Sequence, residues 1–130
     1  MTRNEARENM MKIMYEMDAA GSMDRETADR LCEERLSGNH IERGRTLLGK
    51  IIENMDHIDE EINRNSRLWK TGRMPKVDLA IMRLAVGEIK YCDDIPDAVA
   101  VSEAISIAEK YSTGQSSKFI HGVLGAVTKK

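Results

Sequence analysis

KVDLAIMRLAVGEIKYC, residues 76–92, carries apolar side chains on nearly every side of the helix that it is predicted to form. A helix with this pattern is normally the buried centre of a helical bundle. Pro75 precedes it and suits the first turn of a helix, where the missing N–H costs nothing. We therefore expect the rest of the chain to pack around residues 76–92.

Helical periodicity also dominates on both sides of this segment, and no stretch shows the sustained alternation of a β-strand. We predict a single all-α domain over residues 1–130, with seven helices in two packed bundles: about three helices in residues 1–56 and about four in residues 57–130. Asn39, Asp56 and Ser116 are predicted N-caps, because short polar side chains accept hydrogen bonds from the free N–H groups of a helix start. The predicted helices cover about 3–20, 24–36, 39–55, 57–65, 76–92, 96–112 and 116–130.

The composition limits the kinds of function. Acidic residues number 22 and basic residues 20, so a nucleic-acid site can only be a local patch of the surface. Cys32 and Cys92 are expected to be free thiols, as is usual in a reducing cytosol. The polar start and the lack of an apolar run of membrane-helix length predict a cytoplasmic protein with no membrane contact.

No pattern of catalytic or metal-binding residues stands out. His40, His57 and His121 are scattered, and none neighbours a cysteine or a serine in a nucleophile-like context. The sequence has neither a glycine-rich phosphate loop nor zinc-ligand spacing. We therefore expect a protein that is not an enzyme and that holds no metal or cofactor.

Two charged residues interrupt the apolar pattern of residues 76–92. An isolated buried charge is costly, so Arg83 needs a partner, and Glu103 on the next helix is the candidate for a structural ion pair. Glu88 lies near the end of the helix. It either makes a similar structural contact or faces a partner protein.

The first predicted helix carries a stripe of candidate RNA contacts. Steps of four residues place Arg3, Arg7 and Tyr15 along one slowly rotating line. Two guanidinium groups followed by a tyrosine suit phosphate contacts and a stacked base. Glu5 and Glu8 offset the two arginines, so an ordinary charged helix flank is the alternative.

A basic segment, residues 64–76, leads into the central helix and has no acidic residue. A basic segment that contains an aromatic residue is the minimum signature of a nucleic-acid patch. In the alternative interpretation, Trp69 packs between the two bundles and the charges keep the segment solvated, so contact with RNA and contact with protein both stay open. The basic residues recur at every third position, at Arg64, Arg67, Lys70, Arg73 and Lys76.

The start of the last predicted helix is the third candidate site. Phe119 is the one phenylalanine of the chain and lies at the edge of an apolar face, with Lys118 on the other side. The free N–H groups of a helix start attract phosphate. A half-exposed ring at such a terminus favours RNA contact, and core packing is the alternative. We expect this site to lie next to the arginines of the first helix.

These features together resemble the NusB family of bacterial transcription antitermination factors. The likeness is specific in RMPKVDLAIMRLAVGEIKYCDDIPDAVAVSEAISIAEKYSTGQSSKFIHGVLGAV, residues 73–127, and looser over residues 20–68. In the first helix, Arg7 and Tyr15 match the family. The matching parts are the Val-Asp-x-Ala-Ile-x-Arg-Leu-Ala run at 77–85, Glu88, Ile-Pro at 95–96, Ser102-Glu103-Ala104, Ala108 and Lys118-Phe119-x-x-Gly-Val-Leu.

The resemblance implies a two-bundle helical fold and a function. Members of the family bind the boxA element of nascent RNA as a heterodimer with NusE, ribosomal small-subunit protein ten. The pair joins the transcribing RNA polymerase and suppresses premature termination, notably in ribosomal RNA operons. Some members form homodimers, so a homodimer is a candidate assembly, and the NusE-facing surface is implied to lie on the C-terminal bundle with Glu88. RNA-binding roles are implied for Arg3, Arg7, Tyr15, Gln115, Ser116, Ser117, Lys118 and Phe119.

Several residues depart from the family pattern. Asn4 and Glu5 stand at positions where basic residues are frequent in the family, and Gly87 stands where an aromatic residue is common. Ser102 and His121 stand where asparagines are usual. These departures predict weaker RNA binding by the chain alone and more reliance on NusE. One alternative function is a protein–protein adaptor of the same fold with little RNA binding of its own. A similar bundle fused to ribosomal RNA cytosine methyltransferases is a poorer match, because the sequence has no cofactor loop.

Overall fold

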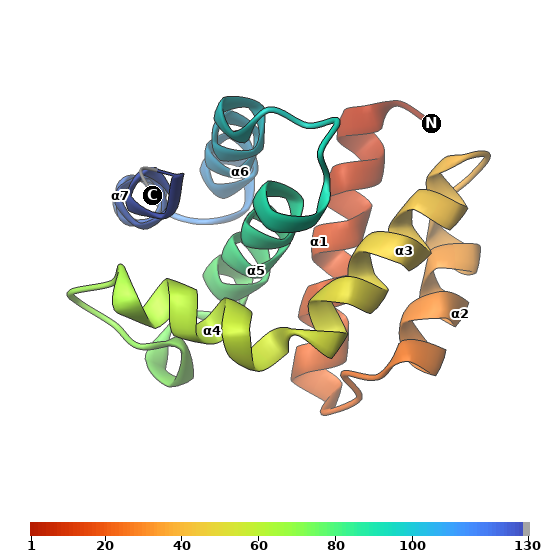
Figure 1. Ribbon diagram of the computed structural model, residues 1–130, viewed down its shortest axis with the longest axis horizontal. Helices are drawn as coiled ribbons and strands as arrows, with labels where there is room; N and C mark the ends of the chain where they lie inside the picture. Colours follow the sequence, from red (N-terminus) through yellow and green to blue (C-terminus); the bar gives the residue numbers. More distant parts are fainter. Residues whose placement is uncertain (129–130) are drawn as a thin grey trace.

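The computed structural model describes residues 1–128, which form seven α-helices and one 3₁₀ turn without a strand (Figure 1). This confirms the predicted all-α class. The predicted last two residues of the seventh helix lie outside the described part. The helices are α1 (Arg3–Ala20), α2 (Arg25–Arg35), α3 (His40–Glu53), α4 (Met55–Arg64), α5 (Lys76–Tyr91), α6 (Asp97–Tyr111) and α7 (Gly114–Thr128), and the 3₁₀ turn η1 covers Thr71–Arg73.

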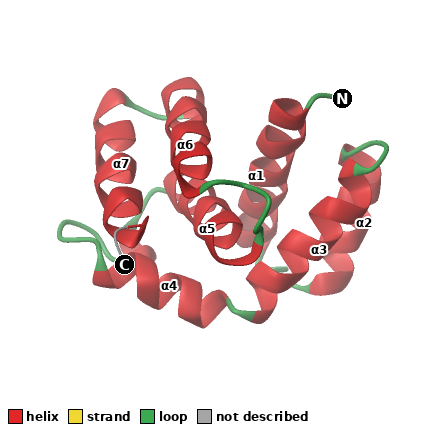
Figure 2. Ribbon diagram, turned by 45° about the horizontal axis from the view of Figure 1, so that its top comes forward, coloured by secondary structure: helices red, strands yellow, loops and turns green. Residues whose placement is uncertain are grey.

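Helix α5 is the centre of the molecule, as its sequence predicts. It packs against α1, α3, α4, α6 and α7, and Figure 2 shows it with α1–α3 on one side and α6 and α7 on the other. Its buried residues run from Asp78 to Glu88 with Arg83 as the one partly exposed exception. Since each fully buried large apolar side chain stabilises the fold by about 1.5–3 kcal/mol, this helix supplies a large part of the core.

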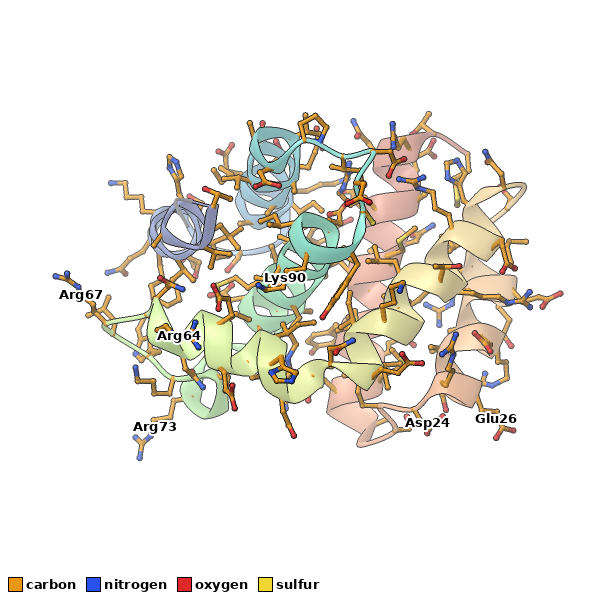
Figure 3. The ribbon with its side chains drawn as sticks, in the orientation of Figure 1. Asp24, Glu26, Arg64, Arg67, Arg73 and Lys90 are labelled. Atoms are coloured by element: carbon orange, nitrogen blue, oxygen red, sulfur yellow. The ribbon has the colours of Figure 1, made fainter. Side chains whose placement is uncertain are left out.

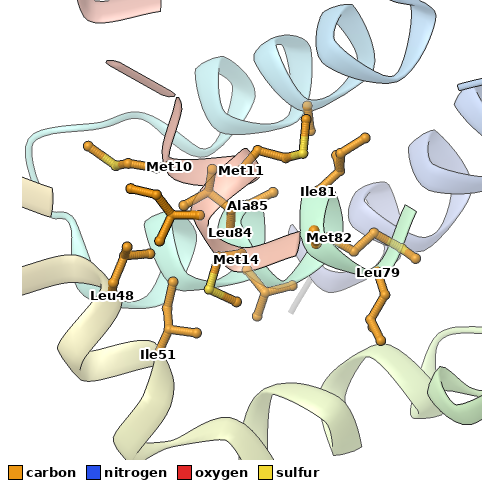
Figure 4. Packing of buried hydrophobic residues seen from close by; sticks show 14 of the residues in the cluster. Met10, Met11, Met14, Leu48, Ile51, Leu79, Ile81, Met82, Leu84 and Ala85 are labelled. Carbon is orange, nitrogen blue, oxygen red and sulfur yellow. The ribbon is translucent and has the colours of Figure 1, made fainter. Parts of the chain in front are cut away.

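The hydrophobic core is one continuous cluster that spans both predicted bundles. Methionines of α1 and aliphatic residues of α3 meet the central residues of α5 in it (Figure 4). Met10, Met11 and Met14 come from α1, and Leu48 and Ile51 come from α3. The exact boundaries of two separate bundles therefore stay a prediction. None of the described helices is both long enough and apolar enough to cross a membrane.

The helix starts agree with some of the predicted caps and correct others. The side chains of Thr2 and Glu5 form a reciprocal capping box on α1. At α3, the side chain of Asn39 makes no cap hydrogen bond, and α4 begins one residue earlier than Asp56. At α7, Oγ1 of Thr113 accepts the hydrogen bond from the Ser116 backbone N–H at 3.1 Å, so the helix begins before Ser116.

Gly87 marks a very close approach between α3 and α5. A Cβ atom at this position would lie 2.5 Å from both Cγ1 and Cδ1 of Ile51, which is fully buried. Ile51 therefore occupies the space beside α5 that a larger residue at position 87 would need. This explains how the core stays filled without a side chain at position 87.

The two cysteines are free thiols, as predicted. Cys32 is buried, and burial raises the pKa of its thiol to about 11. A thiol with such a pKa is almost fully protonated near neutral pH and is therefore a poor nucleophile. Within residues 1–128, the structure groups no set of three His, Cys, Asp or Glu side chains suited to a metal ion.

Candidate nucleic-acid interface

Phe119 lies at the boundary between core and surface. Ile120, Val123 and Leu124 form the buried face of α7, and Phe119 flanks this face as a partly buried residue packed against the core. Its ring meets Trp69 edge-to-face, with centroids 5.1 Å apart and planes at 69°. Trp69 stays 38% exposed. The predicted core packing of Phe119 is therefore present on one side of its ring, and the aromatic pair forms a partly exposed surface, so its RNA contact stays a prediction.

The other residues predicted at the start of α7 divide between surface and interior. Gln115 and Lys118 are exposed, and Lys118 has no ion-pair partner among the described residues. Ser116 is buried, and its hydroxyl accepts a hydrogen bond from the Thr113 hydroxyl. Ser117 donates its hydroxyl to the carbonyl of Gly114 within the same helix. The side chains available to a ligand here are thus Gln115, Lys118 and the aromatic pair.

Tyr15 lies on α1, one turn after a residue that contacts the end of α6. Its side chain is 38% exposed. One helical turn earlier, Lys12 Nζ lies 5.2 Å from the ring centroid of Tyr111. Tyr111 ends α6, three residues before α7 begins at Gly114. The contact of Lys12 with Tyr111 therefore joins α1 to the end of α6, shortly before the start of α7.

Arg7 and Glu88 form a buried ion pair, so the structural contact that was one of the two predicted roles of Glu88 is present. Arg7 is 6% exposed and Glu88 is 4% exposed. The Arg7 Nε donates to both carboxylate oxygens of Glu88 at 3.2 and 3.0 Å, and Nη2 lies 2.9 Å from Oε2. Burial raises the pKa of Glu88, and the Arg7 guanidinium opposes this shift. Both side chains are thus largely covered by the rest of the chain, and the RNA-binding role of Arg7 and the partner-binding role of Glu88 stay predictions.

Arg3 is exposed but lies at the other end of α6. Its guanidinium is 3.4 Å from Oδ2 of Asp94, which also lies 2.8 Å from Nη1 of Arg43. Asp94 belongs to the loop before α6, whereas α7 starts just after the end of α6. Because α6 has 15 residues, these two places are separated by about 22 Å. The predicted adjacency of the first-helix arginines and the last-helix start is wrong.

Arg83 pairs with Asp59 and not with Glu103. Its Nε and Nη2 donate to the two carboxylate oxygens of Asp59 at 2.9 and 2.8 Å. The guanidinium lies on the side of α5 that faces α4 and the end of α1, where Asp18 is 3.8 Å away. Glu103 instead approaches Arg7, with 3.8 Å between Oε2 and Nη1. The predicted ion pair of Arg83 exists, but its acidic partner was assigned to the wrong helix.

The basic segment, residues 64–76, lies against α7 through Trp69. The aromatic partner of this tryptophan is thus Phe119 on α7. Figure 3 shows Arg67 and Arg73 pointing outward at this corner, with Asp24 and Glu26 at the far side of the molecule. Both arginines are exposed and have no ion-pair partner within residues 1–128. The corner is thus a local basic patch on a protein whose overall charge is close to neutral.

Sequence reasoning alone found each ring and cation but not their arrangement. The Trp69–Phe119 contact joins residues 50 positions apart, and the Arg7–Glu88 hydrogen bonds join residues 81 positions apart. One signal for the burial of Arg7 was present in the sequence, because Ala6, Met10 and Met11 surround it with apolar positions at helical spacing.

Comparison with known proteins agrees with this architecture. The NusB family model matches residues 4–129. A transcription antitermination protein NusB from Finegoldia magna is 36% identical over 131 residues, covering 100% of this chain and 96% of that protein. The solved structure of T. maritima NusB has a TM-score of 0.90 and 30% identity, covering 100% of this chain and 92% of that one.

A second solved structure, of antitermination factors NusB and NusE in complex with double-stranded RNA, shares the fold. It has a TM-score of 0.84 at 22% identity and covers 98% of this chain and 96% of that one. The family match extends over nearly the whole chain, and the structural match covers all of it. The protein described here therefore belongs to the NusB family.

Proposed function

We propose that this protein binds boxA RNA together with NusE, ribosomal small-subunit protein ten, and acts in transcription antitermination. The observation that carries the proposal is the partly exposed ring pair of Trp69 and Phe119 beside the exposed Lys118 at the start of α7. Support comes from relatives named transcription antitermination protein NusB. It also comes from a similar fold solved with NusE and RNA.

Base stacking and a few phosphate contacts would provide the binding energy. Single-stranded RNA is commonly held by bases stacked on aromatic rings, at about 1–3 kcal/mol per base. Tyr15 and the Trp69–Phe119 pair offer such rings, and Lys118 with the first turn of α7 offers positive charge. Because Arg3 and Arg7 already face carboxylates, the isolated chain has few free cations on this surface. We expect weak, strongly salt-dependent binding without NusE.

The substitution Lys118→Glu tests this site. It should weaken boxA binding several-fold and leave NusE binding intact. Lys118 is exposed at the start of α7, where RNA is proposed to bind, and it forms no ion pair within residues 1–128. Fluorescence anisotropy with labelled boxA RNA and a pull-down with NusE measure the two activities. Arg30→Glu on α2 is a control with the same charge change. Loss of both activities in a folded Lys118→Glu protein would contradict separate RNA and protein surfaces.

The proposed role is that of a non-enzymatic adaptor in the cytoplasm, joined with NusE to the transcribing RNA polymerase complex. Ribosomal RNA operons are the proposed targets. A homodimer that covers the RNA surface is a proposed resting assembly, and its presence would be seen as a concentration-dependent mass in sedimentation experiments that falls when boxA RNA and NusE are added.

A protein–protein adaptor with little RNA binding is the second candidate function. The observation that favours it is the use of both first-helix arginines in internal ion pairs. Titration of boxA RNA and a scrambled RNA, each with and without NusE, separates the two functions. Preference for boxA in the presence of NusE supports the antitermination role. Equal, weak binding of both RNAs under all conditions supports the adaptor.

A further inference from the structure

We propose that the loop between α4 and α5 forms a second RNA contact, in which Arg67 and Arg73 bind phosphates of single-stranded RNA next to the boxA element. The inference deepens the proposed function and rests on it. It assigns a ligand to the part of the basic segment that the fold does not use, and it extends the RNA-binding surface beyond the start of α7.

The loop is held in a defined shape by its own polar contacts. The Asn63 Oδ1 accepts a hydrogen bond from the Thr71 backbone N–H at 2.8 Å. The buried Ser66 hydroxyl donates to the carbonyl of Trp69. Lys70 Nζ donates to the carbonyls of Asn63 and Ser66 at 2.9 and 3.0 Å. Residues at the tip are therefore presented by a preorganised loop, which lowers the entropy that binding would cost.

Three of the five basic residues of the segment make polar contacts within residues 1–128 of the protein, and two do not. Arg64 lies 2.7 Å from Glu61, and Lys76 lies 3.4 Å from Asp18. Lys70 closes the loop through the two carbonyls described above. Only Arg67 and Arg73 are left as exposed guanidinium groups with no acidic partner in the described part of the chain. They lie on either side of the 38%-exposed ring of Trp69 in the sequence.

Trp69 makes this pair of arginines continuous with the proposed boxA site. Its ring centroid is 5.1 Å from that of Phe119, so the loop tip and the start of α7 form one surface. An RNA strand that stacks on this aromatic pair brings its neighbouring phosphates to the loop. Guanidinium groups bind phosphate through paired N–H donors, and they need no particular base sequence to do so.

An RNA strand fits this surface better than a protein partner does. Ring faces beside unpaired cations, with no acid from residue 64 to residue 76, match the combination found in grooves for single strands. The one feature that suits a protein is Leu68, which is 73% exposed at the loop tip. A protein partner would depend on this side chain, whereas RNA phosphates would not, so the two ligands can be told apart.

Flanking RNA is the probe that tests the inference. Binding is measured with the full chain and NusE, using boxA RNA alone and boxA RNA extended at one end or the other by an oligouridine tail. The wild type should bind one of the extended RNAs several-fold more tightly than boxA alone. Arg67→Glu/Arg73→Glu should lose this gain. Its log–log salt slope on the extended RNA should be smaller by about 1.4, since each contact with a single strand contributes about 0.7.

Three controls make the result specific. Arg67→Lys/Arg73→Lys keeps the charges and should keep most of the gain. Arg30→Glu changes the net charge at an exposed site on α2 and should leave the gain unchanged. Leu68→Ser should also leave it unchanged. If the glutamate variant loses its helical circular dichroism, Arg67→Gln/Arg73→Gln takes its place.

The inference is overturned if the wild type gains nothing from either tail, or if the double variant keeps both the gain and the salt slope. It is also overturned if Leu68→Ser and the double variant both lose NusE binding while binding extended RNA normally, which would make the loop a protein contact. Failure of the proposed function has a different signature. The wild type would then bind boxA and scrambled cores equally, whether or not the tails add affinity.

Discussion

Basic residues around the start of α1 and basic residues around the start of α7 are used in different ways. At the first place, Arg3, Arg7 and Arg43 all face carboxylates, and the Arg7 pair is buried. At the second, Arg67, Arg73 and Lys118 face solvent without an acidic partner among residues 1–128. Paired charges hold helices together and are not available to a ligand, whereas free charges contribute little to stability and are available to phosphate. The position of a cation on a helix therefore says less about function than the carboxylates that surround it.

The largest expected effect comes from breaking the buried pair at the α1 end. Glu88→Ala leaves the Arg7 guanidinium buried with only Glu103 nearby, at 3.8 Å. We expect a loss of about 3–5 kcal/mol in the free energy of unfolding, as is typical when one member of a buried pair is removed. Urea unfolding measures it. Arg3→Ala removes an exposed pair and should change stability by no more than about 1 kcal/mol. Equal effects of the two substitutions would show that burial does not distinguish these pairs.

Gly87→Ala tests whether the interior next to this pair is as tightly packed as the structure indicates. The new methyl group would meet Cγ1 and Cδ1 of Ile51 at 2.5 Å. We expect a loss of about 1–3 kcal/mol, because overpacking forces side chains or backbone to shift. Ile51→Val alone should also destabilise the protein, but it should cost less in the Gly87→Ala background because it removes Cδ1. Additive losses in the double variant would contradict the close approach.

The aromatic pair should contribute less to stability than to RNA binding. Trp69→Leu, Phe119→Leu and the double variant form a cycle in which we expect a coupling of about 0.5–1.5 kcal/mol in unfolding. Each single variant should also bind boxA RNA more weakly in the presence of NusE. Thermal unfolding and anisotropy titrations provide the two measurements. Full RNA binding by the double variant would show that the rings pack only against each other.

Acidification should have the smallest effect on stability. It should weaken the ion pairs of Asp94 near the start of α1 and leave the cations near the start of α7, unpaired among the described residues, unaffected. Hydrogen bonding to Arg43 holds the pKa of Asp94 below its ordinary value of 3.8. A carboxyl whose pKa is lower in the folded state stabilises the fold above its unfolded pKa, and this contribution is lost as the pH falls through the folded value, below about pH 4. The difference in urea midpoint between wild type and Asp94→Asn should therefore shrink between about pH 7 and about pH 3.

Arg67→Gln is the matched control for this pH series, because it removes a cation that has no carboxylate partner in the described chain. Its small difference from the wild type should be the same at both pH values. A pH-dependent difference for Arg67→Gln as large as that for Asp94→Asn would mean that the two ends are not electrostatically distinct.

The fold could be predicted because its signals are local. The apolar character of residues 76–92 indicates a central helix, and α5 occupies that place. The bounds of α1 follow from Thr2 at one end and from Gly21, whose φ of 68° ends the helix, at the other. In both cases the information lies within the segment itself.

The candidate site could be predicted only in its parts. The choice of Asp59 over Glu103 by Arg83 depends on how α4 and α6 are turned around α5, which no short pattern encodes. The same is true of the pairing between Trp69 and Phe119, which brings the basic segment onto α7. Residue types indicated the chemistry of the surface, but the packing of helices decided which charges remain free.

The Arg7–Glu88–Glu103 contact has a consequence for the order of events during synthesis. Arg7 leaves the ribosome more than 80 residues before its first carboxylate partner, so the opening helix must wait for α5 before its guanidinium can leave water. Helices α2 and α3 can pack on each other during that interval, since they are close in the chain and in contact. A nascent chain stalled before α5 would therefore leave exposed the side of α1 that packs on α5, and the first half of the chain completes its packing only when the second half is present.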